Sequence, residues 1–258
     1  MITQLAISDH DIADLERATL DAVVPHALET LPGWLLPFDT STIGRAKSAV
    51  PLSHQLQDAD IVHAIADRYA VHGLSAAFRV ADVAALSNLH RELHGIGCQP
   101  EQATLVQIGS AQRLLQVFGT GRGTLNTQPT AAWSDVYVAP GFDAVDGAHR
   151  VHALSRSPHV VYASLADAEG PVAAGTASFS HGWASVHGMR TVDRCRGQGL
   201  AGQLLATLAQ EALARGLDRV FLQVDETNTA ALALYQRAGF ATAWRYHYWR
   251  HASPSAHS

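Results

Sequence analysis

The segment RGQGLA, residues 196–201, has the residue types and spacing of a loop that binds a phosphate group. Glycine at 197 and 199 lets the backbone approach a ligand closely, because glycine has no Cβ. Free N–H groups at the start of a following helix would bind the anion. The nucleotide P-loop needs a lysine that is missing here, and the dinucleotide fingerprint GxGxxG does not fit either. We therefore expect a pyrophosphate site of another kind, formed by Arg196, Gly197, Gln198, Gly199, Leu200 and Ala201.

A strand before this loop and a helix after it would hold the loop in place. The range 183–192 reads as a strand, and apolar residues recur at helical spacing over 200–212. Gly216 ends the helix, and 220–224 is a short apolar run typical of a strand buried on both faces. The loop is therefore expected to connect two layers of an α/β structure.

A second helix is expected over 229–238, closed by Gly239. Asn228 and Tyr235 are seven residues apart, which is almost two helical turns, so both face the same side. Ala231 lies between them, and a narrow ligand could lie along that face.

Together, these two motifs resemble the GNAT superfamily of acyl-CoA-dependent N-acetyltransferases, over about residues 172–249. The superfamily's pyrophosphate signature, Gln or Arg followed by xxGxG or A, matches Arg196, Gly199 and Ala201. The second signature matches Asn228, Ala231, Leu234, Tyr235, Gly239 and Phe240. The proline often found before the first signature is Asp193 here, which alters a turn and leaves the glycines in place.

The resemblance implies a GNAT fold with a mixed α/β sheet, acetyl-CoA as co-substrate and no metal. It implies that the strand before the loop offers main-chain groups to the pantetheine and thioester around Met189, Arg190 and Thr191. Asn228 would lie further along the cofactor, and Tyr235 near the sulfur as general acid. A phenol with a pKa near ~10 is protonated at neutral pH, although a packed structural role is the alternative for this side chain.

The sequence does not single out one residue as the general base. Strict alternation along the strand before the loop predicts that one face carries Trp183, Ser185, His187, Met189 and Thr191. Histone-type relatives have a catalytic glutamate at the position of Ser185, which cannot serve as that base. Glu226 and His187 are the predicted candidates, and Asp225 is a neighbour that could act directly or through water. They could instead orient a cationic substrate or cap loops, and an enzyme working at mildly alkaline pH needs no dedicated base.

The first half of the chain shows a similar order of helices and strands. Helices are expected over 9–28, 55–71 and 82–94, and strands over 34–38, 46–52, 76–80 and 103–108. LHRELHGI at 89–96 resembles LYQRAGF at 234–240, with His90 in place of Tyr235. No counterpart of RxxGxA occurs between Leu52 and Gln55. We therefore predict two tandem GNAT-like domains, with a cofactor site only in the C-terminal one.

The predicted boundary lies in a segment rich in glycine and threonine. Residues 1–118 would form the degenerate N-terminal domain, 119–130 a linker, 131–252 the catalytic domain and 253–258 a disordered tail. The boundary segment contains GxGxG after an apolar run, but no amphipathic helix follows it directly, so a loop is favoured over a second phosphate site.

Composition excludes several classes of protein. The net charge of −5, with 16% charged residues and no basic run, argues against nucleic-acid binding and favours a cationic or neutral substrate. No apolar run approaches the roughly 18 residues of a membrane span and no signal peptide is recognisable, so we expect a cytoplasmic protein without a membrane partner. The oligomeric state cannot be read from the sequence.

Cysteines and histidines predict neither a disulfide framework nor a metal site. Cys98 and Cys195 are far apart in the sequence. Fifteen histidines occur, and His90 and His94 have helical spacing, but a zincin would need its glutamate directly after the first histidine. Structural histidines are therefore favoured over zinc.

The acceptor is the part on which the sequence says least. We expect transfer of an acetyl group to a primary amine of a small molecule, amino acid or peptide by direct attack in a ternary complex. A protein-modifying acetyltransferase and a non-catalytic acyl-CoA sensor are the alternatives. WRYHYW at 244–249 could line the acceptor pocket or belong to the core, and the segment 33–48 could close over it with Arg45 and Lys47, or these could be solvated.

Overall fold

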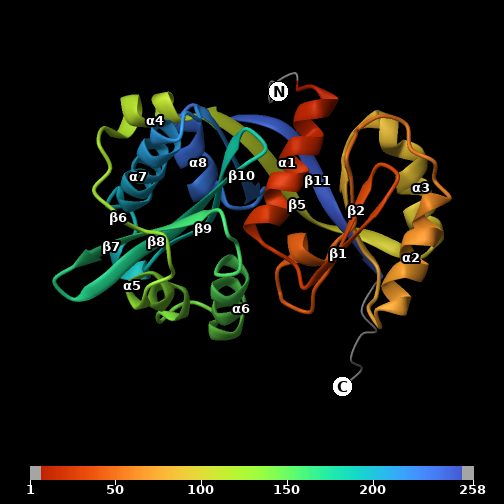
Figure 1. Cartoon of the computed structure of the whole chain (residues 1–258), viewed down its shortest axis with the longest axis horizontal. Helices are drawn as coiled ribbons and strands as arrows, with labels where there is room; N and C mark the ends of the chain where they lie inside the picture. Colours follow the sequence, from red (N-terminus) through yellow and green to blue (C-terminus); the bar gives the residue numbers. More distant parts are fainter. Residues whose placement is uncertain (1–6, 252–258) are drawn as a thin grey trace.

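The computed structural model describes residues 7–251 (Figure 1), so the predicted tail at 253–258 lies outside the described residues. The α-helices are α1 Asp9–Ala22, α2 Ile61–Val71, α3 Ser87–Gly95, α4 Ala111–Phe118, α5 Ala131–Ser134, α6 Ala144–Leu154, α7 Leu200–Ala214 and α8 Thr229–Arg237. The strands are β1 Ala27–Leu31, β2 Trp34–Phe38, β3 Val50–Pro51, β4 Ala77–Ala81, β5 Cys98–Ser110, β6 Thr124–Asn126, β7 Val160–Asp167, β8 Gly170–Ser180, β9 Trp183–Thr191, β10 Arg219–Asp225 and β11 Ala241–His251. None of the helices in this described range is long and apolar enough to cross a membrane.

One large mixed sheet runs through both halves of the chain. Its eight strands lie in the order β4-β11-β5-β10-β9-β8-β7-β6, and β1, β2 and β3 form a separate antiparallel sheet. A parallel bridge between Ala49 and Phe78 connects the smaller sheet to β4. In Figure 1, β1, β2, α2 and α3 lie on one side of the molecule, α5, α6, α7 and α8 on the other, and α4 of the first half lies beside α7.

The two halves exchange strands where they meet. β5, from the first half, pairs with β10 and β11 of the second half, and β11 pairs with β4 of the first half. Both exchanged strands are long, which is why they can reach partners in the other half. The exchange builds one continuous sheet across the molecule.

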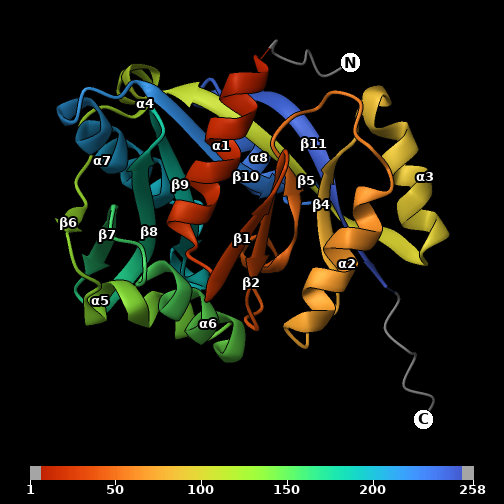
Figure 2. The ribbon, with the colours of Figure 1, turned by 45° about the vertical axis from the view of Figure 1, so that its right-hand side comes forward.

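Helices cover both faces of this sheet. α7 packs on β7, β8 and β9 on one face, while α5 and α1 pack on the opposite face. Figure 2 shows α1 crossing the molecule between the two halves. α1 is also fixed by a buried ion pair, in which Glu16 lies 2.5 Å from Arg79 of β4.

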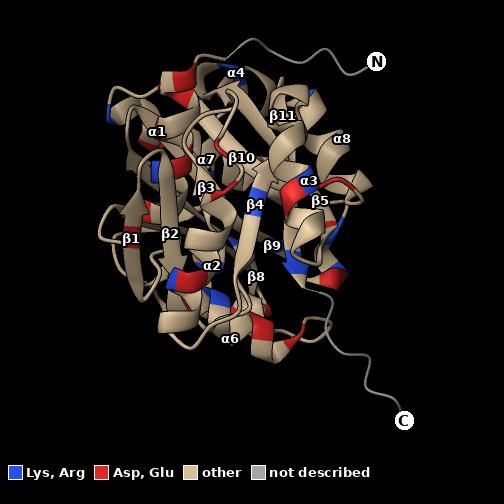
Figure 3. Ribbon diagram, turned by 90° about the vertical axis from the view of Figure 1, so that its right-hand side faces the viewer, with Lys and Arg blue, Asp and Glu red and all other residues tan. Residues whose placement is uncertain are grey.

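Charged residues of both signs are distributed along the fold. In the view of Figure 3, acidic and basic residues alternate over helices and strands and do not gather on one element. This distribution agrees with the composition, in which 23 acidic residues face 18 basic ones.

Several predicted element boundaries are corrected by prolines and turns. The helix predicted to reach Leu28 ends at Ala22, because Pro25 lies directly downstream and disfavours a helical residue before it. The predicted strand over 46–52 is mostly a 3₁₀ turn, Gly44–Lys47, followed by the two-residue strand β3. The helix predicted from Gln55 begins only at Ile61. The strand predicted over 34–38 is confirmed.

The segment 119–130 packs against α7. The Gly121 N–H donates to Gln210 Oε1 at 2.8 Å, and the Gly123 N–H donates to Thr207 Oγ1 at 2.9 Å. A Cβ at Gly121 would lie 2.2 Å from the backbone nitrogen of Thr207, so this glycine permits a close approach of two backbones. These glycines serve packing, and β6 within the segment extends the sheet.

Candidate functional site

The site lies where two parallel strands diverge. In β9 and β10, residues 184–186 pair with residues 220–222. Beyond these residues the two strands separate. Two adjoining cavities occupy the gap between the strands and the helices beside them. The edge of β9 that faces β10 therefore has main-chain groups without a ladder partner from that strand.

A β-bulge at Gly188 shapes this part of β9. The register of the pairing with β8 shifts at this point. Thr176 of β8 lies opposite His187, but Ala174 lies opposite Arg190, so β9 has one extra residue between the two pairs. Gly188 has φ of 63°, and a Cβ there would lie 2.5 Å from Tyr137 Oη, which donates a 2.7 Å hydrogen bond to the Gly188 carbonyl. Only glycine suits this position.

The bulge corrects the predicted alternation. Trp183 is buried in the core with α1, whereas the partly buried Met189 packs against the core formed with α7 and α8. The extra residue moves Met189 to the opposite face from His187 and Trp183, because a bulge shifts the two-residue period.

The first cavity, of about 700 Å³, runs along the predicted pyrophosphate loop, and we call it the donor cavity. The predicted residues that line it are Met189, Arg190, Thr191, Arg196, Gly197, Gly199, Leu200, Ala201, Asn228 and Tyr235. Gln198 does not line it, and its side-chain amide donates to the Arg194 carbonyl at 3.3 Å. The structure thus brings nearly all the predicted donor residues to one surface.

The loop has the properties expected of an anion cradle. Gly197 and Gly199 have φ of 75° and 80°, and open space lies where a Cβ would point. Helix α7 begins at Leu200 with no capping side chain, so the N–H groups of its first turn remain available for an anion. Arg196 is 60% exposed and pairs with Asp193 at 2.7 Å.

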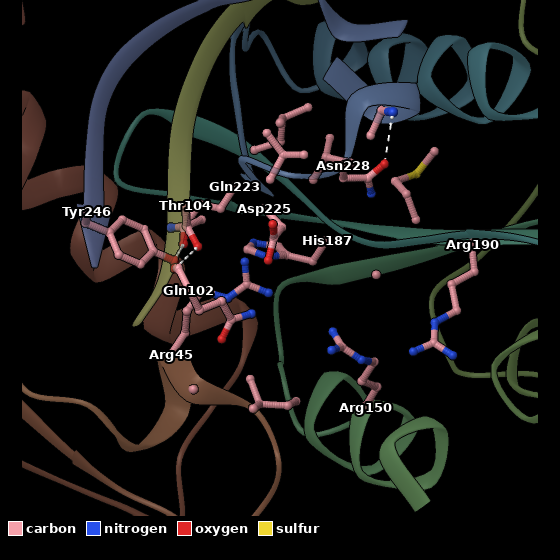
Figure 4. Close-up of a pocket in the computed structure, with 18 of the residues that line it drawn as sticks. Arg45, Gln102, Thr104, Arg150, His187, Arg190, Gln223, Asp225, Asn228 and Tyr246 are labelled. Atoms are coloured by element: carbon pink, nitrogen blue, oxygen red, sulfur yellow. Dashed lines mark hydrogen bonds between the residues drawn. The ribbon is translucent and has the colours of Figure 1, made fainter. Parts of the chain in front are cut away.

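The second cavity, of about 320 Å³, lies beside the first, and we call it the acceptor cavity. Five residues line both: Met189, Arg190, Asn228, Ala231 and Tyr235. Figure 4 shows the side chains around the acceptor cavity, which come from both halves of the chain. Two cavities with a shared wall allow two ligands to meet there.

Tyr235 lies at this shared wall. Its side chain is 7% exposed, and burial raises its pKa to about 12. The phenol therefore keeps its proton at neutral pH. Asn228 has a structural role as well, because its Oδ1 accepts from the Ala231 N–H at 3.1 Å and caps α8.

His187 lines the acceptor cavity without a hydrogen-bond partner. It is 3% exposed, and neither ring nitrogen has a partner among residues 7–251. Burial lowers its pKa well below the usual value, and the charge of Arg45 adds to this effect. The imidazole is therefore neutral and a weak base, and it can exchange hydrogen bonds with a bound molecule.

Glu226 lies outside both cavities, while its neighbour Asp225 lines the acceptor cavity. Glu226 lies 3.4 Å from Arg245, which also binds Asp82. Oδ1 of Asp225 accepts from the N–H of Thr227 at 2.9 Å and from its hydroxyl at 2.6 Å. The structure brings Asp225, rather than Glu226, to His187 and Tyr235.

Sequence reasoning missed several residues of the acceptor cavity. Gln102 and Thr104 reach it because β5 is exchanged into the second half, and Arg150 reaches it from α6. Arg45 lines the acceptor cavity, as one alternative for the segment 33–48 predicted. Lys47 lines a different cavity, which Arg250 of β11 also lines. No local motif marks these positions, since only the fold brings them together.

The aromatic segment near the C-terminus divides between site and core. Tyr246 and Tyr248 line the acceptor cavity, and Trp244 and Trp249 are buried in the core. Trp249 packs between His90 and His94, at centroid distances of 5.3 and 4.8 Å. Within residues 7–251, no three His, Cys, Asp or Glu side chains are grouped to hold a metal, and both cysteines are free.

Comparison with known proteins gives the family. The sequence model described as "Probable histone acetyltransferase Rv0428c C-terminal" matches residues 9–249, nearly the whole chain. The chain belongs to this family. The match spans both halves, so the family is defined by the combined architecture and not by the second half alone.

Relatives of this family member agree with the fold. The uncharacterized N-acetyltransferase YobR of Bacillus subtilis is 29% identical over 123 residues, which are 47% of this chain and 50% of YobR. The chain thus matches only half the length of this curated relative. A GCN5-related N-acetyltransferase from Kribbella flavida matches 95% of this chain and 97% of its own, with a TM-score of 0.67 at 17% identity. A tandem GNAT protein from the clavulanic acid biosynthesis pathway matches 99% of both chains, with a TM-score of 0.60 at 17% identity.

The prediction of the GNAT superfamily, with its mixed α/β sheet, is confirmed by these matches. The tandem GNAT protein matches from end to end, so the predicted tandem fold has a counterpart among solved structures. The chemistry of this family member has to be argued from its own cavities.

Proposed function

We propose that this protein is an acetyl-CoA-dependent N-acetyltransferase that acts on a primary amine by direct attack in a ternary complex. The observation that carries the proposal is the pair of cavities that share one wall, with Tyr235 in that wall. Acetyl-CoA would lie in the donor cavity and the amine in the acceptor cavity. The anion cradle lies in the second half of the described chain, so we assign the cofactor site to residues 131–252 and a supporting role to residues 1–118.

The residues of the donor cavity fit acetyl-CoA. The N–H groups of 196–201 would bind its pyrophosphate, and the pantetheine would lie along the free edge of β9, at Met189, Arg190 and Thr191. The open space above Gly197 and Gly199 is what a pyrophosphate needs for close approach. Bound in this way, acetyl-CoA would present its thioester near the bulge and Tyr235.

The chemistry at the shared wall follows from the states of the side chains. The amine nitrogen attacks the thioester carbon, the carbon–sulfur bond breaks, and the thiolate takes a proton. Tyr235 would give that proton, since its raised pKa keeps it protonated. Asp225 and the neutral His187 would hold the amine by accepting its hydrogen bonds, with excess protons leaving to water.

Release of free thiol from acetyl-CoA in the presence of pooled amines tests this function. We expect saturable, amine-dependent thiol release and an acetylated amine of matching mass. Acetyl-CoA binding without release for any amine would support an acyl-CoA sensor, and the absence of binding would contradict the proposal.

A protein acceptor is the second candidate, because the family description names a histone acetyltransferase. Lysine-rich peptides therefore belong in the amine pool. Faster thiol release with such peptides than with any small amine would favour this second function.

A further inference from the structure

The acceptor cavity has an excess of positive charge. Its lining contains three arginines, Arg45, Arg150 and Arg190, and one carboxylate, Asp225. A cationic amine alone would meet net repulsion there. This lining contrasts with the net charge of −5 of the whole chain, from which a cationic or neutral substrate was expected.

Two of these arginines are already held by a carboxylate. Asp146 Oδ2 lies 2.7 Å from both Arg150 Nε and Arg190 Nη2, and the arginines hold the pKa of Asp146 below its usual value. Thr42 donates to the other carboxylate oxygen at 2.9 Å. This cluster fixes the rim of the cavity between the first half and α6.

Arg45 has no such partner. No hydrogen bond or ion pair connects it to any residue of the described range 7–251, although it is partly buried. In Figure 4 its side chain extends from the first half toward His187 and Asp225, opposite Arg150 and Arg190. A guanidinium that is partly removed from water needs an acceptor with which to form charge-assisted hydrogen bonds.

A second observation points to a ligand at the same place. His187, which is 3% exposed and lines the cavity, leaves both ring nitrogens without partners in the described chain. Buried polar atoms are normally hydrogen-bonded, so the cavity is built to receive polar groups. Arg45 and His187 therefore offer an anion site and a hydrogen-bond site side by side.

From this juxtaposition, and resting on the function proposed above, we infer that the acceptor is a small amine that carries a carboxylate, as an amino acid does, and that Arg45 binds the carboxylate. The amino group then lies toward Asp225, His187 and Tyr235. The first half of the chain thus has a function in the site, because it supplies the residue that selects the acceptor.

Calorimetric titration tests the inference without relying on turnover. The twenty amino acids, each paired with its neutral amide, are titrated into the protein saturated with CoA, and CoA binding is measured first. We expect at least one amino acid to bind on the order of 10- to 100-fold more tightly than its amide, the range of a charge-assisted hydrogen bond. Arg45→Gln should abolish this preference, Arg45→Lys should keep part of it, and Arg91→Gln, an exposed arginine on α3, should keep all of it.

The outcomes separate the inference from the proposed function. Failure to bind CoA would contradict the proposed acetyltransferase function. In that case, titration of the amines into the protein without CoA would still test whether the acceptor carries a carboxylate. Equal binding of acid and amide, no binding of any amino acid, or an undiminished preference in a folded Arg45→Gln would overturn the inference. Phosphoethanolamine and ethanolamine form a further pair, and binding of phosphoethanolamine alone would overturn the carboxylate in favour of a phosphate.

Discussion

Tyr235 is the residue on which the chemistry most depends, and its environment defines a clear expectation. Replacement by phenylalanine keeps the packing against Phe240 and removes only the proton donor. We expect kcat to fall by about 10²-fold or more, with acetyl-CoA affinity unchanged. Steady-state kinetics together with calorimetry would check this. A Tyr235→Phe variant with near-normal turnover would show that the tyrosine is only a packed side chain.

The dependence of kcat on pH tests the protonation states of Tyr235 and His187. Because burial raises the pKa of Tyr235 to about 12, its acid form persists from neutral to strongly alkaline pH. The lowered pKa of His187 likewise keeps its imidazole neutral down to pH values well below 6.5. We therefore expect kcat to show no ionisation of either group between pH 6.5 and about 10. A limb in this range that disappears in Tyr235→Phe or His187→Ala would contradict these environments.

Asp225 and Glu226 form a matched pair for locating the amine. Only Asp225 lines the acceptor cavity, whereas Glu226 is paired with Arg245. We expect Asp225→Asn to lower kcat/KM for the amine by about 10²-fold, and Glu226→Gln to change it by less than about twofold. The reverse order, measured with one amine at fixed acetyl-CoA, would restore Glu226 as the base predicted from the sequence.

The residues that line the donor cavity could largely be predicted from the sequence, and those that line the acceptor cavity could not. The donor residues sit in two short motifs whose spacing reflects one loop and one helix face. Arg45, Gln102 and Arg150 come from three separate segments, so no local pattern connects them. Glu226 was preferred to Asp225 because a one-residue difference at a strand end cannot be read without the fold.

At the scale of the elements, the bulge in β9 and the glycine loop before α7 make the site. The strand and the helices around the loop were predictable from apolar periodicity. The bulge was not, because Gly188 carries no signal of its φ without the contact to Tyr137. Pro25 shortened a helix, and the 3₁₀ turn at Gly44–Lys47 shortened a strand, that periodicity alone extended.

Gly199 and Gly216 begin and end α7 and provide a controlled test of the anion cradle. Both have positive φ, 80° and 75°, with open space where a Cβ would point. Alanine at either position should cost about 1 kcal/mol of stability, since L-residues avoid this conformation. Only Gly199→Ala should also weaken acetyl-CoA binding. We expect its Kd to rise tenfold or more, which corresponds to about 1.4 kcal/mol. Equal binding by the two variants would mean that the loop does not hold the cofactor.

The whole molecule is defined by the strand exchange between its halves. Much of the order of helices and strands in each half could be predicted from the sequence. The exchange of β5 and β11 could not, because swapped and unswapped pairings bury similar strands and leave the same sequence pattern.

The exchange predicts that neither half folds alone. Separated from the rest of the chain, residues 1–118 would leave both edges of β5 unpaired, and residues 119–258 would leave β11 without β4 and β5. We expect no cooperative unfolding transition for either fragment and a restored transition when the two are mixed. The full chain cleaved after Phe118 is the control, and a cooperative transition in one isolated fragment would contradict the exchange.

The most direct test of the account is the titration of acetyl-CoA into the purified protein, with ATP and NAD as controls. The cradle at Arg196 to Ala201 and the adjoining cavity predict saturable binding of acetyl-CoA, with no comparable binding of ATP or NAD. Binding of ATP or NAD in preference to acetyl-CoA, or no binding of acetyl-CoA, would contradict the assignment of this cavity to the acetyl donor.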